Sequence, residues 1–166
     1  SYPAVRKEIC NGFVKIISEK YPDVDIIAGV ATGAIAHGAL VADRLNKPFV
    51  YVRSSPKTHG LNNQVEGECW QNAKVVVIED LVSTGGSSLC AVEALRENGC
   101  DVLGMVAIFT YEFPTAKENF AAADVQLDTL SNYSTMIELA VQEGYVHADE
   151  VHTLQEWRRD PANWKR

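Results

Sequence analysis

Two adjacent carboxylates follow an apolar run in the segment VVVIEDLVSTGGSS, Val75 to Ser88. Behind Glu79 and Asp80, small hydroxyl residues and glycines lead into a helical pattern. A turn of this kind offers backbone N–H groups and the positive end of a helix dipole, which together bind phosphate. Because carboxylates repel phosphate, the acid pair is expected to address sugar hydroxyls or a Mg²⁺ ion. The segment therefore predicts a sugar-phosphate site.

Two other interpretations of this segment are weaker. It lacks the lysine of GxxxxGK[ST], which is typical of nucleoside triphosphate sites, and it is not the GxGxxG of dinucleotide sites. The acids can also be read as a helix cap and the glycines as a plain turn. The coincidence of strand, acid pair and hydroxyl-glycine turn favours the ligand site, whose candidate hydroxyls are those of Ser83, Thr84, Ser87 and Ser88.

The elements that must position this site alternate along the chain. Short runs rich in Val and Ile predict five strands buried on both faces, at residues 25–31, 47–53, 73–80, 101–109 and 124–130. Helical patterns lie between them, an amphipathic helix precedes them, and two helices follow them at about 134–146 and 149–161. This order predicts an α/β fold with a mainly parallel five-stranded sheet covered by helices on both faces. In such a sheet ligands bind outside the carboxyl ends of the strands, where Glu79 and Asp80 stand.

Composition limits the class of protein. The 166 residues are 46% hydrophobic and carry a net charge of -7, which predicts one domain and argues against a general nucleic-acid binder. The four cysteines have no CxxC pair and no metal-like spacing, so we expect reduced thiols in a cytoplasmic protein. No apolar run approaches the length of a membrane span, so we expect no membrane partner.

The polar segment from Ser54 to Trp70 breaks the alternation of strands and helices. It carries Pro56, Gly60 and Gly67, has little periodicity, and is longer than a structural loop requires. Loops of this length are usually functional or disordered.

Three segments together resemble a known family. VVVIEDLVSTGGSS resembles the phosphoribosyl pyrophosphate signature of type I phosphoribosyltransferases. GVATGAIAHGALVADRLNKPFVYVR resembles the pyrophosphate loop and following helix of orotate phosphoribosyltransferases, and RSSPKTHGLNNQVEG resembles their mobile catalytic loop. The resemblance covers most of residues 26–99 and implies one phosphoribosyltransferase domain over residues 1–166, with a flexible catalytic loop at about 54–67.

The resemblance also implies site residues. Glu79 and Asp80 would hold the ribose hydroxyls, and the donor's ribose and 5'-phosphate would lie along Glu79, Asp80, Leu81, Val82, Ser83, Thr84, Gly85, Gly86 and Ser87. The pyrophosphate loop would be Ala31, Thr32 and Gly33, with a non-proline cis peptide at Ala31-Thr32. The implied catalytic residues are Arg53, Lys57, His59 and Asp80. Mg²⁺ would be held mainly by the substrate, with Asp80 as the candidate protein ligand.

The implied activity is Mg²⁺-dependent transfer of phosphoribose to orotate, giving orotidine 5'-phosphate and pyrophosphate in pyrimidine (UMP) biosynthesis. Cationic groups on the closing loop would stabilise negative charge on the departing pyrophosphate. The family's loop reaches the partner subunit's site, which implies a homodimer. Two alternatives remain: a purine phosphoribosyltransferase, or a non-catalytic regulatory protein that senses phosphoribosyl pyrophosphate.

The chain departs from the family pattern at named places. Some orotate enzymes carry a lysine where this chain has Gly33, and a second basic residue where it has Ser54. The chain begins at SYPAVR, without the family's N-terminal segment that forms a hood over the base. From this side, Tyr111 and Phe113 are the nearby candidates for contacting the base.

Overall fold

Six strands form one sheet in the computed structural model, which describes residues 2–53 and 64–164. The elements are, in chain order, α1 (Pro3–Lys20), β1 (Ile26–Val30), α2 (Ile35–Leu45), β2 (Phe49–Val52), β3 (Val65–Glu66), β4 (Lys74–Val82), α3 (Gly86–Glu97), β5 (Asp101–Thr110), α4 (Pro114–Ala122), β6 (Leu127–Asn132), α5 (Tyr133–Gln142), the 3-10 turn η1 (Ala148–Glu150), α6 (Val151–Arg159) and the 3-10 turn η2 (Pro161–Asn163).

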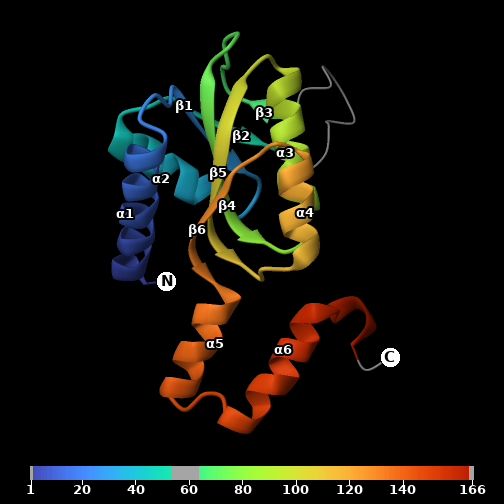
Figure 1. Cartoon of the computed structure of the whole chain (residues 1–166). Coiled ribbons are helices and arrows are strands. Elements are labelled where there is room, and N and C mark those ends of the chain that lie inside the picture. Colours follow the sequence, from blue (N-terminus) through green and yellow to red (C-terminus); the bar gives the residue numbers. More distant parts are fainter. Residues whose placement is uncertain (1, 54–63, 165–166) are drawn as a thin grey trace.

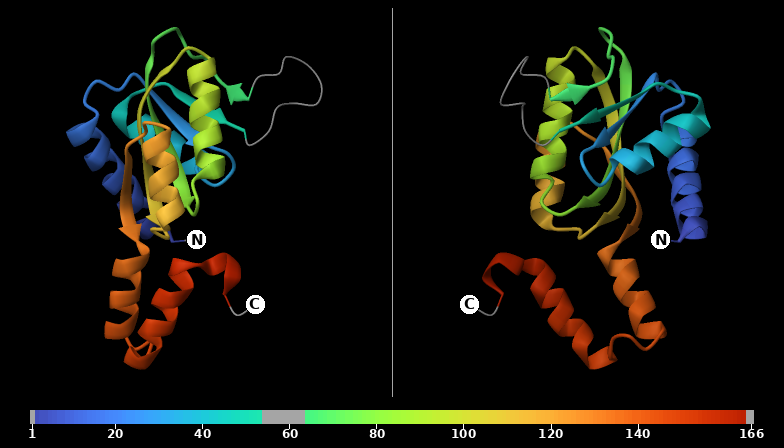
Figure 2. Two further views of the ribbon diagram at one scale, coloured as in Figure 1. Left: turned by 45° about the vertical axis from the view of Figure 1, so that its right-hand side comes forward. Right: turned by 180° about the vertical axis from the view of Figure 1, so that it is seen from behind.

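The strands lie in the order β3-β2-β1-β4-β5-β6, and every neighbouring pair is parallel except β2 and β3. Helices α1 and α2 cover one face of the sheet, and α3 and α4 cover the other (Figures 1 and 2). The predicted α/β fold with a mainly parallel sheet is confirmed. β1 pairs directly with β4, with Gly29 opposite Ile78, so the turns that follow these two strands lie at the same edge of the sheet.

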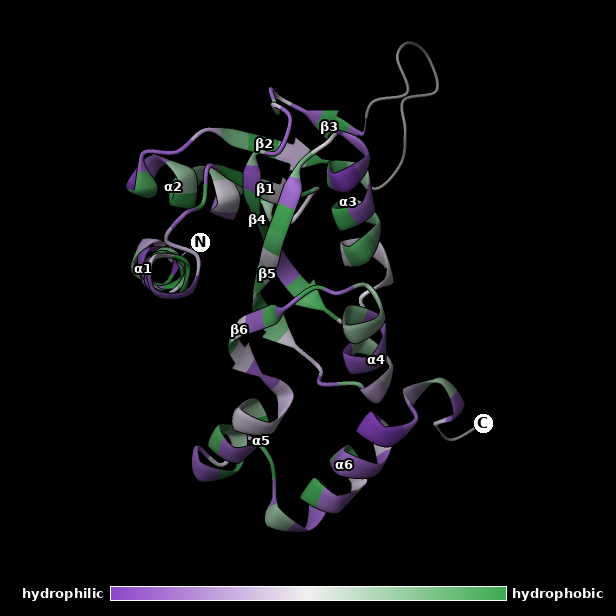
Figure 3. Cartoon of the chain, turned by 45° about the horizontal axis from the view of Figure 1, so that its top comes forward, coloured by the Kyte–Doolittle hydropathy of each residue, from purple (hydrophilic) through white to green (hydrophobic). Residues whose placement is uncertain are grey.

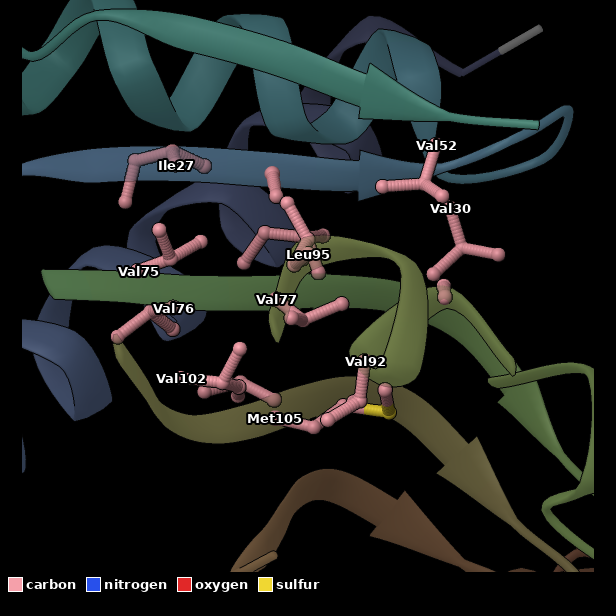
Figure 4. Close-up of a cluster of buried hydrophobic side chains, with 14 of the residues drawn as sticks. Ile27, Val30, Val52, Val75, Val76, Val77, Val92, Leu95, Val102 and Met105 are labelled. Carbon is pink, nitrogen blue, oxygen red and sulfur yellow. The ribbon is translucent and has the colours of Figure 1, made fainter. Parts of the chain in front are cut away.

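The core lies along the central strands. Every residue of β1 is buried, as are residues 75–79 of β4. Figure 4 shows Ile27, the strand valines and Met105 gathered with Val92 and Leu95 of α3 in one hydrophobic cluster. In Figure 3 hydrophobic colour runs along β5, whereas α6 is mostly hydrophilic. Burial on both faces explains why these strands read as continuous apolar runs.

The sheet has one strand more than the five predicted. β3 is only two residues long and pairs antiparallel with β2, with Val65 opposite Val52. It falls inside the polar segment that showed no periodicity, because two residues are too few to display a period of two. Where the chain leaves and re-enters the described part, the Arg53 N–H donates to the Gln64 carbonyl oxygen at 2.9 Å.

Helices α5 and α6 project beyond the carboxyl end of β6 (Figures 1 and 2). α5 begins where the side chain of Asn132 accepts a hydrogen bond from the Thr135 N–H, a standard N-cap. α6 is joined to the loop after β5 by Arg158, which donates to Glu112 at 2.9 Å and to the Ser134 hydroxyl at 2.7 Å. Helices α5 and α6 therefore lie at the same edge of the sheet as the turns after β1 and β4 (Figure 1).

All four cysteines are free thiols, as predicted. Among the helices of residues 2–53 and 64–164, none combines the length and the apolar character needed to cross a membrane.

Candidate functional site

Two turns meet at the carboxyl edge of the sheet. The turn after β1 contains Ala31, Thr32 and Gly33, and the turn after β4 begins at Ser83. A Cβ atom built on Gly33 would overlap the carboxylate of Asp80, so the turn after β1 lies directly against Asp80 near the end of β4. The Ala31-Thr32 peptide is cis, as the family resemblance implied. The segments predicted to bind pyrophosphate and sugar phosphate are therefore brought side by side.

The two acids occupy different environments. Glu79 is only 4% exposed, whereas Asp80 is exposed. The Asp80 N–H donates to Glu79 Oε1 at 2.9 Å, and the Ser88 hydroxyl donates to Glu79 Oε2 at 2.8 Å. Burial and the neighbouring Asp80 side chain raise the pKa of the Glu79 carboxyl to about 7, against the lowering effect of these two hydrogen bonds. Asp80 presents its carboxylate outward, and Glu79 holds its carboxylate inward.

Strand β4 extends through Leu81 and Val82, which pair with Phe109 and Thr110 of β5. Val82 is fully buried and Leu81 is 41% exposed. The strand therefore continues for two residues beyond the acid pair, and both acids lie inside β4 rather than at its end. Of these two residues, only Leu81 offers its side chain to solvent.

The turn after β4 is supported from helix α4. The Asn119 side chain donates to the Thr84 carbonyl oxygen at 2.9 Å. Gly85 has a φ of +85° and lies against Phe120, so a side chain there would be both strained and blocked. Helix α3 then starts at Gly86 without a side-chain cap. The first N–H groups of α3 therefore have no side-chain cap, which suits an anion.

The hydroxyl residues of this turn divide into two groups. Ser83, Thr84 and Ser87 are exposed, and their hydroxyls are available to a ligand. Ser88 is 1% exposed and bonds Glu79 instead, so the expectation that its hydroxyl faces the phosphate was wrong. Successive helical residues differ by about 100° in direction, which sends Ser87 outward and Ser88 inward.

The predicted catalytic loop lies largely outside the described residues, and with it Lys57 and His59. Arg53 is described: it is partly exposed and lies 3.6 Å from Glu66 of β3 in an ion pair. The last residues of the predicted loop, Gln64 to Gly67, include β3.

An aromatic cluster stands next to the turn after β4. The Tyr111 N–H donates to the Val82 carbonyl oxygen at 3.2 Å, and the Tyr111 ring stacks on Phe113 with centroids 5.3 Å apart. Trp157 of α6 packs edge-on against both rings, with centroids 5.8 Å from each, and Tyr133 completes the group. Sequence reasoning named Tyr111 and Phe113 but missed Trp157, because no local spacing links a residue on α6 to the end of β5.

Across residues 2–53 and 64–164, no three His, Cys, Asp or Glu side chains come together as a metal-binding group. Asp80, whose carboxylate is exposed, is an acid available to a ligand-bound cation beside the turn after β1.

The comparisons with known proteins agree with this geometry. Residues 4–146 match the phosphoribosyl transferase domain family. The chain is 60% identical over 164 residues to an orotate phosphoribosyltransferase of Porphyromonas gingivalis, covering 99% of this chain and 78% of that protein. It is 55% identical over 165 residues to an orotate phosphoribosyltransferase of Bacteroides fragilis, again with 99% and 78% covered. The crystal structure of orotate phosphoribosyltransferase from Aeropyrum pernix superposes with a TM-score of 0.77 at 29% identity, covering 87% of this chain and 79% of that one.

Proposed function

Because this chain belongs to the orotate phosphoribosyltransferase family, and is therefore an enzyme of the glycosyltransferase class, we propose that it transfers phosphoribose from phosphoribosyl pyrophosphate to orotate. The products are orotidine 5'-phosphate and pyrophosphate, a step in pyrimidine synthesis. The bond between the anomeric carbon and the pyrophosphate oxygen breaks as an orotate nitrogen attacks that carbon. The observation that carries the proposal is the close approach of Gly33 to Asp80, which brings the turn after β1 against the acid pair that precedes the turn after β4.

The turns divide the donor between them. The 5'-phosphate lies in the turn of Ser83 to Ser87, where the uncapped N–H groups of α3 and exposed hydroxyls supply hydrogen bonds. The pyrophosphate lies in the turn of Ala31 to Gly33, which has no bulky side chain in the way. The ribose then lies between them against the acid pair. The exposed Asp80 carboxylate accepts from its hydroxyls, and Glu79 accepts through the acceptor positions that the Asp80 N–H and the Ser88 hydroxyl leave unused.

Mg²⁺ fits this donor set. The metal takes one or two carboxylates together with substrate phosphates in sites that lack a full protein cage. Asp80 is the exposed carboxylate that lies against Gly33. Asp80 would hold Mg²⁺ together with the donor's phosphates, and the bound metal would supply positive charge against the pyrophosphate.

The cations of the loop act on the same leaving group. Lys57 is the proposed principal catalytic lysine, with His59 as a hydrogen-bond donor to pyrophosphate and Arg53 at the base of the loop. Positive charge placed where negative charge develops lowers the barrier most in a site closed to water. Lys57→Ala should then abolish turnover and leave donor binding largely intact. A regulatory protein that only senses the donor would show no turnover in either form.

The assay that tests the function uses one sample in two steps. Calorimetric titration with phosphoribosyl pyrophosphate and Mg²⁺ is followed by orotate, whose absorbance reports conversion. Binding followed by orotate consumption supports the proposal, whereas binding followed by consumption of adenine or hypoxanthine in place of orotate would assign a purine substrate. A chain that binds no donor would contradict the proposal altogether.

We also propose a homodimer in which the loop of one subunit serves the site of its partner. Mixing Lys57→Ala and Asp80→Asn chains tests this arrangement. If the loop acts across the interface, hybrid dimers contain one site with both native residues, and the mixture recovers about a quarter of the native rate. If each subunit uses its own loop, the mixture stays inactive.

A further inference from the structure

Ser88 is a buried hydroxyl directed at an acid of the proposed ribose site. It lies in the first turn of α3, is 1% exposed, and donates to Glu79 Oε2 at 2.8 Å. A buried polar group of this kind is stable only when it is hydrogen-bonded. Its partner is equally buried, since Glu79 is 4% exposed. The Ser88 hydroxyl therefore donates its hydrogen bond to the Glu79 carboxylate and not to a ligand.

The two hydrogen bonds to Glu79 fix its carboxylate from both sides. Oε1 accepts the N–H of Asp80 on the same strand, and Oε2 accepts the Ser88 hydroxyl on the following helix. A carboxylate has about four acceptor positions, so two remain for ligand hydroxyls. With one bond removed, Oε2 loses its protein donor and the carboxylate is free to turn about its last torsion.

We propose that Ser88 is a positioning residue for ribose binding. By donating to Oε2 of Glu79, its hydroxyl fixes the carboxylate and thereby sets how strongly the chain binds one ribose hydroxyl. This rests on the proposed function, in which Glu79 is a ribose ligand. The effect of Ser88 is confined to ligands that carry the hydroxyl in question. A residue that only stabilised the fold would weaken all phosphate ligands alike.

The test compares ribose 5-phosphate with its 2-deoxy and 3-deoxy analogues by calorimetry. The native chain should bind ribose 5-phosphate more tightly than the analogue that lacks the hydroxyl held by Glu79. In Ser88→Ala, affinity for ribose 5-phosphate should fall about tenfold, the scale of a charge-assisted hydrogen bond, while affinity for that analogue changes little. Discrimination between the two ligands should thus be largely lost.

A second variant guards against a folding defect. Ser88→Cys is nearly the same size but has only a weak S–H donor, so it should also lose discrimination while keeping the packing. Cys90→Ala, an exposed position on the same helix, is the matched control and should behave as the native chain. Far-ultraviolet circular dichroism and the melting temperature report whether each variant is folded.

The outcomes separate the inference from the function on which it rests. Native-like discrimination in a folded Ser88→Ala or Ser88→Cys chain would overturn the role of Ser88 and leave the proposed function standing. An equal loss for ribose and deoxyribose ligands would do the same, because it indicates a structural role alone. A native chain that binds neither ribose 5-phosphate nor phosphoribosyl pyrophosphate would overturn the proposed function, and the role of Ser88 with it.

Discussion

The carboxylate of Asp80 fills the space that a side chain at Gly33 would need. Gly33→Ala must therefore turn Asp80 away from the position it has between the two turns. Because Asp80 is exposed and has room to move, we expect the free energy of unfolding to change by less than about 1 kcal/mol. Affinity for phosphoribosyl pyrophosphate should fall about tenfold or more, as expected when a ligand-binding group is displaced.

Urea unfolding and calorimetry measure the two effects separately. Gly12→Ala is a suitable control, since Gly12 lies in α1 and the nearest atoms to a Cβ there belong to the flexible Leu130 side chain, at 3.0 Å. The control should keep donor affinity. A Gly33→Ala chain that binds the donor as well as the native chain would show that the position of Asp80 is unimportant.

Glu79 should make stability depend on pH. Its pKa in the folded chain is about 7 against an ordinary 4.5, so the folded state holds more protons than the unfolded chain between these values. Stability from this group is fully present below pH 4.5 and is lost as pH rises through 7. The loss is at most about 3.5 kcal/mol for a shift of this size.

Urea unfolding at pH 5 and pH 8, without ligand or metal, measures this loss. In Glu79→Gln the difference between the two pH values should shrink, because the amide does not titrate. Glu93→Gln, which changes an exposed glutamate on α3, should keep the native difference. If Glu79→Gln has the native pH dependence, Glu79 ionises in the folded chain as it does in the unfolded one.

Asn119 should matter to the phosphate turn from outside it. Asn119→Ala removes the hydrogen bond to the Thr84 carbonyl oxygen, which we expect to cost about 1 kcal/mol of stability. It should also weaken binding of ribose 5-phosphate, since the turn loses its support from α4. Calorimetry checks the affinity. Glu118→Ala on the exposed side of the same helix is the control, and equal affinities for the two variants would contradict the prediction.

Tyr21 should affect stability without affecting catalysis. Its hydroxyl donates to Asp128 at 2.8 Å, and Asp128 also pairs with Lys20. Burial, and then the Asp128 carboxylate, raise the pKa of Tyr21, so its hydroxyl remains a donor at neutral pH. Tyr21→Phe should lower the free energy of unfolding by about 1 to 2 kcal/mol.

The contact between Tyr21 and Asp128 lies near the amino ends of the strands, away from the ligand turns. Turnover of orotate should therefore be unchanged in Tyr21→Phe. Tyr2→Phe, at a residue 80% exposed, should leave both quantities unchanged. A loss of turnover in Tyr21→Phe that exceeds its loss of folded protein would show coupling between the two edges of the sheet.

Much of the fold was predictable because its signals are local. Apolar runs marked the central strands, and burial of Val75 to Glu79 shows why that run carried no alternation. The expected burial on both faces was wrong for β6, which is only half-buried along its length, and for β2, where buried and half-buried residues alternate. The acid pair was recognisable by its place after such a run. The cis peptide at Ala31-Thr32 was predictable only through the family resemblance, since the residues themselves give no such signal.

What sequence reasoning missed depends on packing between distant segments. The direction of Ser88 depends on how α3 docks on β4, and a helical pattern alone does not specify that. Trp157 reaches Tyr111 only because α6 folds back against the loop after β5. β3 exists because β2 offers it a partner, and its two residues have no preference strong enough to reveal it.

The central position of β1 and β4 also determines at which stage of unfolding the ligand site loses its structure. Each of these strands is hydrogen-bonded on both sides, and amide protons in such strands usually exchange with solvent only when the whole domain unfolds. Edge elements such as β3 and the projecting helices α5 and α6 usually open at a lower free energy than the central strands. Partial opening at these edges would leave the turns after β1 and β4 attached to the most protected strands. Capacity to bind the donor's phosphates should then persist through sub-global fluctuations and disappear together with the slowest-exchanging amides.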